Sequence, residues 1–103
     1  MKLGELDLFV SLGAIAQWEE VRGKNFLSTF NAPPFGIKDL AEFVFQLHRV
    51  ASKRQGKNIK LDTEVIMDAF SYKELAGVIN EATPEILNQY GISTDVEDTK
   101  KKE

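Results

Sequence analysis

Residues 11–27, with the sequence SLGAIAQWEEVRGKNFL, combine an amphipathic helix, a glycine stop and an immediate apolar restart. Apolar side chains recur there at steps of three and four residues, which predicts one helical face made of Leu8, Leu12, Ile15, Trp18 and Val21. Gly23 follows with the backbone freedom that closes a helix. We expect this helix to run from about Phe9, although the alternation over residues 6–10 also fits a short extended entry.

The centre of the chain predicts one short helix and one long helix. Asn25 can cap the short helix, and the consecutive Pro33 and Pro34 prevent it from continuing. The long helix is expected from about Ile37 to Gln55, because its apolar side chains form a regular stripe. We expect this helix to lie at the centre of the core.

The last third of the chain carries further start and stop signals. Asp62 is expected to cap a fourth helix, and Ser71 with Glu74 three residues later has the pattern of a capping box for the next. Pro84 predicts a kink or a fresh helix start, because proline is tolerated at the first helical position but not deep inside. The sequence therefore predicts an all-α fold, a compact bundle of about five short to medium helices.

Composition indicates a single domain over residues 1–92 and a charged, disordered tail over residues 93–103. The chain has 103 residues, a formal net charge of −3 and no cysteine, which excludes disulfides and cysteine-ligated zinc. No apolar stretch approaches the ~20 residues of a membrane helix, and the first residues are too acidic for a secretion signal. We expect a cytoplasmic protein that contacts no membrane and has little affinity for nucleic acid.

The sequence contains no recognisable catalytic constellation. His48 is the only histidine, so one chain cannot build a two-histidine metal site or a histidine-paired dyad. The acid pairs at residues 19–20 and 97–98 are adjacent in sequence and would diverge on a helix. We therefore predict that the chain is not an enzyme and that it has no catalytic residue, no metal site and no cofactor.

Two groups of side chains are candidates for partner binding. Seven phenylalanines and one tryptophan are more than one small core readily holds. The aromatic residues that either widen the core or form an exposed apolar patch are Phe26, Phe30, Phe35 and Phe45. The basic residues that either stabilise the end of the long helix or dock an acidic partner are Arg49, Lys53, Arg54 and Lys57.

Several segments keep a characteristic order along the chain. They are LFVSLGAI at residues 8–15, WEE at 18–20, GKNFL at 23–27, DLAEFVF at 39–45 and LDTEVI at 61–66. In this order they resemble the tail assembly chaperones of long-tailed bacteriophages. The fourth segment is similar to that family's Asp-Leu-Ala-containing apolar helix, and the fifth to its Leu-Thr-Leu-Glu-Glu-Val type of helix entry.

This resemblance implies a non-enzymatic morphogenesis factor, made in the cytoplasm of the bacterial host by a phage or prophage. Such a factor binds the long tape measure protein, helps the tail tube protein polymerise around it, and is absent from the mature virion. A tape measure is a long helical polypeptide with apolar stripes, which a small helical protein can cover by helix-in-groove packing. Many copies are needed along such a client, so we expect a homo-oligomer.

Two other functions stay open at this point. The first is a head-tail connector or other structural virion protein, which would remain in purified particles. The second is a small DNA-binding regulator that uses the basic segment from Arg49 to Lys60. The net acidity and the lack of a clear recognition helix disfavour the regulator.

Overall fold

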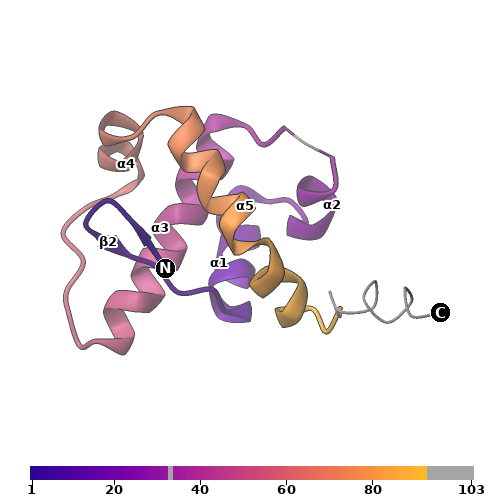
Figure 1. The fold of residues 1–103 in the computed structure, drawn as a ribbon, viewed down its shortest axis with the longest axis horizontal. Helices are drawn as coiled ribbons and strands as arrows, with labels where there is room; N and C mark the ends of the chain where they lie inside the picture. The colour runs from indigo at the N-terminus through magenta and orange to yellow at the C-terminus, as the bar shows by residue number, and fades with distance from the viewer. Residues whose placement is uncertain (33, 93–103) are drawn as a thin grey trace.

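The central element of the computed structural model is helix α3, Ile37–Arg54; the structure describes residues 1–32 and 34–92. The elements that contact α3 are α1 (Leu12–Arg22), α4 (Thr63–Ala69), α5 (Tyr72–Gln89) and strand β2 (Leu6–Asp7). The short helix α2 (Phe26–Phe30) packs against α1. In Figure 1, α5 crosses α3, and α2 and α4 lie at opposite sides of the molecule. The predicted all-α bundle of about five helices is confirmed.

The capping signals in the sequence place most helix ends correctly. Gly23 closes α1 in the left-handed conformation, with φ of 68°. Asn25 and Asp62 accept backbone N–H hydrogen bonds at the starts of α2 and α4. Ser71 and Glu74 form the predicted capping box at the start of α5. These predictions hold because each depends only on residues a few positions apart.

The first eleven residues form no helix, so the expected helix start near Phe9 is wrong. Strand β1 (Lys2–Leu3) pairs antiparallel with β2 through a turn in which Gly4 has φ of 59°. The backbone N–H of Phe9 then donates to the carbonyl oxygen of Leu47 at 3.1 Å, which holds the segment extended along α3. Helix α1 begins only at Leu12, because the Ser11 hydroxyl accepts the N–H of Ala14 and caps it.

The apolar face predicted for the first helix is also corrected. Ile15 and Trp18 are buried, but Leu12 and Val21 are each 51% exposed. A helix advances about 100° per residue, so residues spaced three apart gradually move around its axis. Leu12 and Val21 are nine residues apart and therefore lie on opposite sides of the helix, about 180° from each other. Arg22, four residues after Trp18, lies on the buried side instead.

Pro84 lies inside the continuous helix α5, so of the two alternatives predicted from the sequence, a kink or a fresh helix start, the fresh start is wrong. A proline removes the N–H that would bond the carbonyl four residues earlier, which here belongs to Asn80. Both Asn80 and Pro84 are exposed, so water can hydrate that carbonyl. The buried face of α5, which includes Ile79 and Ile86, is uninterrupted on both sides of the proline. Core packing therefore keeps the helix continuous.

The corner that joins α1 to α2 is fixed by the buried carboxylate of Asp39, which is 3% exposed. Its two oxygens accept hydrogen bonds from Arg22 Nε and Lys24 Nζ, each at 2.7 Å. Its carbonyl oxygen accepts the indole N–H of Trp18 at 2.8 Å. Burial alone would raise the pKa of Asp39, but hydrogen bonds and positive charge from Lys24 and Arg22 hold it below its ordinary value.

None of the helices in the described part of the chain has both the length and the apolarity of a membrane span. The tail predicted for residues 93–103 lies outside the described residues.

Candidate docking surfaces

A groove between α2 and α5 includes two of the phenylalanines singled out from the sequence, Phe30 and Phe35. It has a volume of about 320 Å³. We call it the α2–α5 groove, and its lining residues are Phe30, Pro34, Phe35, Leu40, Tyr72, Ala76, Ile79, Asn80 and Thr83. All of these residues are uncharged. The groove can therefore accept apolar side chains of a partner.

A hydrogen bond between α5 and the loop after α2 holds the two sides of the groove together. The Tyr72 hydroxyl donates to the carbonyl oxygen of Phe35 at 2.6 Å. Tyr72 itself is 41% exposed, so its ring forms part of the groove's rim. The bond fixes the loop by its backbone and leaves the Phe35 side chain free to pack inward.

Behind the groove lies a cluster of aromatic rings centred on Phe26. Its ring centroid lies 5.1 Å from that of Trp18 and 5.3 Å from that of Phe43. Phe30 and Phe35 pack against the same ring, at 5.8 and 5.9 Å. The backbone N–H of Phe26 also donates to Glu19 Oε2 at 2.8 Å, which anchors the start of α2 to α1.

For the four phenylalanines, the sequence left open whether they widen the core or form an exposed patch. Phe26 is fully buried and Phe35 nearly so, so the first alternative holds for these two residues. Phe30 and Phe45 are half-buried and contact the core. Only Phe30 and Phe35 come together at one surface feature, the α2–α5 groove. The core holds the aromatic rings because they stack on one another around Phe26.

The exposed aromatic side chains are Phe9 and Tyr72, which the sequence prediction did not select. For Phe9 a signal was present, because it alternates with Leu8 and Val10. In an extended segment, alternate residues face opposite sides, and here Leu8 and Val10 are buried while Phe9 faces outward. The alternation also fits the extended entry considered from the sequence, but a helix from about Phe9 was favoured, so Phe9 was not selected.

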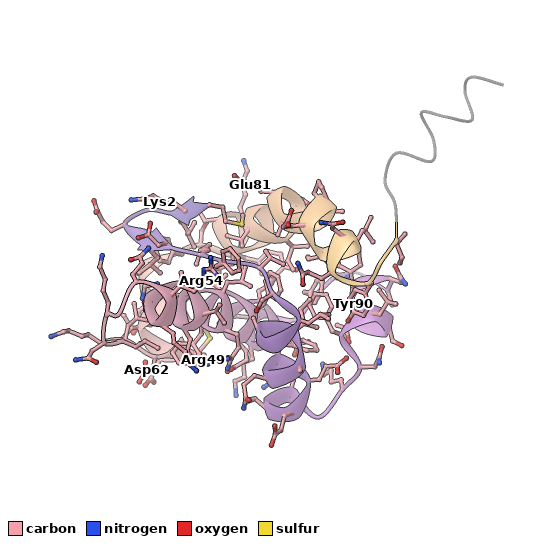
Figure 2. All side chains as sticks on the ribbon, turned by 90° about the horizontal axis from the view of Figure 1, so that it is seen from below. Lys2, Arg49, Arg54, Asp62, Glu81 and Tyr90 are labelled. Atoms are coloured by element: carbon pink, nitrogen blue, oxygen red, sulfur yellow. The ribbon has the colours of Figure 1, made fainter. Side chains whose placement is uncertain are left out.

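The basic residues predicted as a patch lie near the C-terminal end of α3, where Figure 2 labels Arg49 and Arg54. Arg49 is half-buried and its Nε donates to Gln46 Oε1 at 2.7 Å. Lys53 and Lys57 are exposed. The guanidinium carbon of Arg54 lies 4.0 Å from the centre of the Phe9 ring. Two of the four basic side chains, Arg49 and Arg54, therefore have partners within the fold, while Lys53 and Lys57 have none among the interactions of the described residues.

His48 serves to join the N-terminal hairpin to α3. Its Nδ1 lies 3.0 Å from the carbonyl oxygen of Asp7, and its Nε2 lies 3.3 Å from the hydroxyl of Ser52. A carbonyl oxygen can only accept, so Nδ1 carries a proton and donates to Asp7, and in a neutral ring Nε2 accepts from the Ser52 hydroxyl. Within residues 1–32 and 34–92, no group of three or more histidine, aspartate or glutamate side chains could hold a metal ion.

Comparison of the chain with protein-family models, with curated proteins and with solved structures gives no match. The function is therefore inferred from the residues and contacts of this chain.

Proposed function

We propose that this chain is a phage tail assembly chaperone that binds an apolar helical face of the tape measure protein in the α2–α5 groove. The observation that carries the proposal is the uncharged groove backed by stacked aromatic rings. It is supported by the order of segments that resembles the chaperone family. In this role the chain acts without catalysis and without a cofactor.

The groove's size suits the side chains of a docked helix. A volume of about 320 Å³ is too small for a whole helix but can receive apolar side chains spaced three or four residues apart along its face. Asn80 and Thr83 lie beside the apolar lining and can orient the client by hydrogen bonds. The core rings behind the groove give it a preformed shape, which lowers the cost of binding.

In the proposed pathway the chain works in the cytoplasm of the bacterial host. It covers the tape measure's apolar stripes until the tail tube protein replaces it, and it leaves before the virion is complete. A head-tail connector or another structural virion protein would instead remain in purified particles, so the protein content of those particles separates the two functions.

A charge placed in the groove should weaken client binding. We expect Ala76→Glu to lower the affinity for the tape measure protein at least tenfold, because a carboxylate facing an apolar client loses its water without gaining a partner. The measurement is co-expression of the two proteins in bacteria, followed by affinity capture of the tape measure and quantification of both chains.

Gly77→Glu is a matched control for this experiment. It adds the same charge at the next residue of α5, where a new Cβ meets no atom within 4 Å, so binding should be unchanged. Asn80→Glu adds a charge at the exposed edge of the groove and serves if Ala76→Glu does not fold. Equal binding by folded Ala76→Glu, Asn80→Glu and Gly77→Glu proteins would show that the groove is not the client site.

A further inference from the structure

A second surface of the molecule has an exposed apolar centre between two hollows. The first hollow, of about 620 Å³, lies against the end of α3 and includes Arg54. The second, of about 320 Å³, lies against α5 and includes Glu81 and Glu85. Phe9 lines both hollows, as do Met1 and Leu8, so the hollows adjoin along this segment.

The surface between the hollows, formed by the Met1 and Phe9 side chains, is apolar and accessible. Phe9 and Met1 are each 38% exposed, although both are large apolar side chains. Arg54 covers one face of the Phe9 ring from the first hollow, with 4.0 Å between the guanidinium carbon and the ring centre. The remaining surface of Phe9 can contact another protein.

The two hollows carry charges of opposite sign. Among the described residues, Arg54, Glu81 and Glu85 take part in no ion pair. Asp7, the acid in the first hollow, accepts a hydrogen bond from Gln55 and pairs with Lys2. Arg54 is therefore the charged side chain of the first hollow that has no partner of opposite charge. The N-terminal ammonium of Met1, which lines both hollows, donates to the Leu8 carbonyl oxygen at 3.3 Å. Figure 2 labels Arg54 on α3 and Glu81 on α5.

We propose that this surface is the interface of a homodimer. A twofold axis near Phe9 places the basic hollow of each copy over the acidic hollow of the other. Arg54 of one copy then faces Glu81 and Glu85 of its partner, and the same contact occurs twice. The Phe9 and Met1 side chains of both copies pack at the centre and lose their exposure to water.

A second copy fits this surface better than an apolar client helix does. A surface that has an apolar centre and charges of opposite sign on either side is complementary to itself after a twofold rotation. An uncharged helix face would bury Arg54, Glu81 and Glu85 without partners, which is costly. The dimer does not depend on the chaperone proposal, because the α2–α5 groove shares no lining residue with either hollow.

The test is sedimentation velocity on the full chain over a concentration series. The wild-type protein is expected to dimerise. Arg54→Glu should weaken the dimer at least tenfold, because it places like charges against Glu81 and Glu85. The double variant Glu81→Lys with Glu85→Lys should weaken it similarly, because it places positive charges against Arg54.

A mixture of the two variants gives the sharpest result. In a heterodimer, the carboxylate introduced at position 54 of one chain faces the two ammonium groups introduced at positions 81 and 85 of the other, while the second contact is the native one. The mixture should therefore recover a dimer that neither variant forms alone, and the recovery should weaken as salt is added. Recovery in the mixture requires both chains to be folded, so it also excludes misfolding as the cause of the loss.

Two charge changes outside both hollows serve as controls. Lys73→Glu and Glu20→Lys alter exposed positions and should leave the dissociation constant of the dimer unchanged. A monomeric wild-type protein, or a mixture that stays monomeric, would overturn the proposal. So would an equal loss of dimer in the control variants.

Discussion

Phe26→Ala is expected to lower the free energy of unfolding by about 3–5 kcal/mol, the range for large-to-small changes at a buried phenylalanine. Phe26 is fully buried, and four other aromatic rings lie around it: Trp18, Phe30, Phe35 and Phe43. Removing the central ring leaves a cavity that the four neighbouring rings cannot fill completely. A domain of this size is stable by about 5–15 kcal/mol, so the change would consume much of its stability.

Urea denaturation followed by tryptophan fluorescence measures this effect, since Trp18 is the only tryptophan and is fully buried. Phe45→Ala is the matched control. Phe45 is only half-buried at the edge of the core, so its loss should cost about 1 kcal/mol. Similar losses in the two variants would mean that Phe26 is not the centre of the aromatic cluster.

Asp39→Asn is expected to cost about 2–3 kcal/mol at neutral pH. Breaking a fully buried ion pair costs about 3–5 kcal/mol. The cost expected for Asp39→Asn is below that range because Arg22 and Lys24 are partly exposed and can regain water. The variant keeps the shape of the side chain but removes its charge. Both cations then lose the carboxylate that joins the end of α1 to α3.

The cost of Asp39→Asn should depend on pH in a defined direction. The folded protein holds the pKa of Asp39 below its ordinary value of 3.8. The charged pair therefore contributes its full stability above that value and loses it as the pH falls through the lower, folded-state pKa. Asp7 also has a lowered pKa, mainly through a hydrogen bond from Gln55, but both proteins retain Asp7. Its contribution cancels in the difference.

Urea titrations of wild-type and Asp39→Asn proteins at a series of pH values test this expectation. The difference in unfolding free energy should be constant between about pH 5 and 7 and should shrink below the ordinary pKa of the carboxyl. A difference that persists unchanged into strong acid would show that the cost of Asp39→Asn does not come from losing the charge of the carboxylate.

Local sequence signals predicted the helix caps well, because a cap depends on neighbours in the chain. Asn25, Asp62 and the Ser71–Glu74 box were correct for this reason. The continuity of α5 through Pro84 could not be predicted in this way, because it depends on the helix face packed against the core. The hairpin was missed because its strands are only two residues each.

The candidate surfaces were predicted less well than the fold. Phe30 and Phe35 were selected, but the groove that joins them needs Ala76 and Thr83 from α5, which are distant in sequence. Whether Phe26 belongs to the core or to an exposed patch could not be decided from the sequence, because counting aromatic residues does not show how rings stack. The basic segment was correctly located at the end of α3, but the sequence did not show that Arg54 would cover Phe9.

The most direct test of the central claim is an NMR titration of the ¹⁵N-labelled chain with a peptide from an apolar stripe of the tape measure protein. We expect the amide shifts to concentrate at groove residues, including Phe30, Ala76 and Thr83, and to vanish in the Ala76→Glu variant. The same peptide should cause the same amide shifts in the Gly77→Glu protein as in the wild type. Shifts confined to the Phe9 surface or to the end of α3, or no shifts at saturating peptide, would contradict the account.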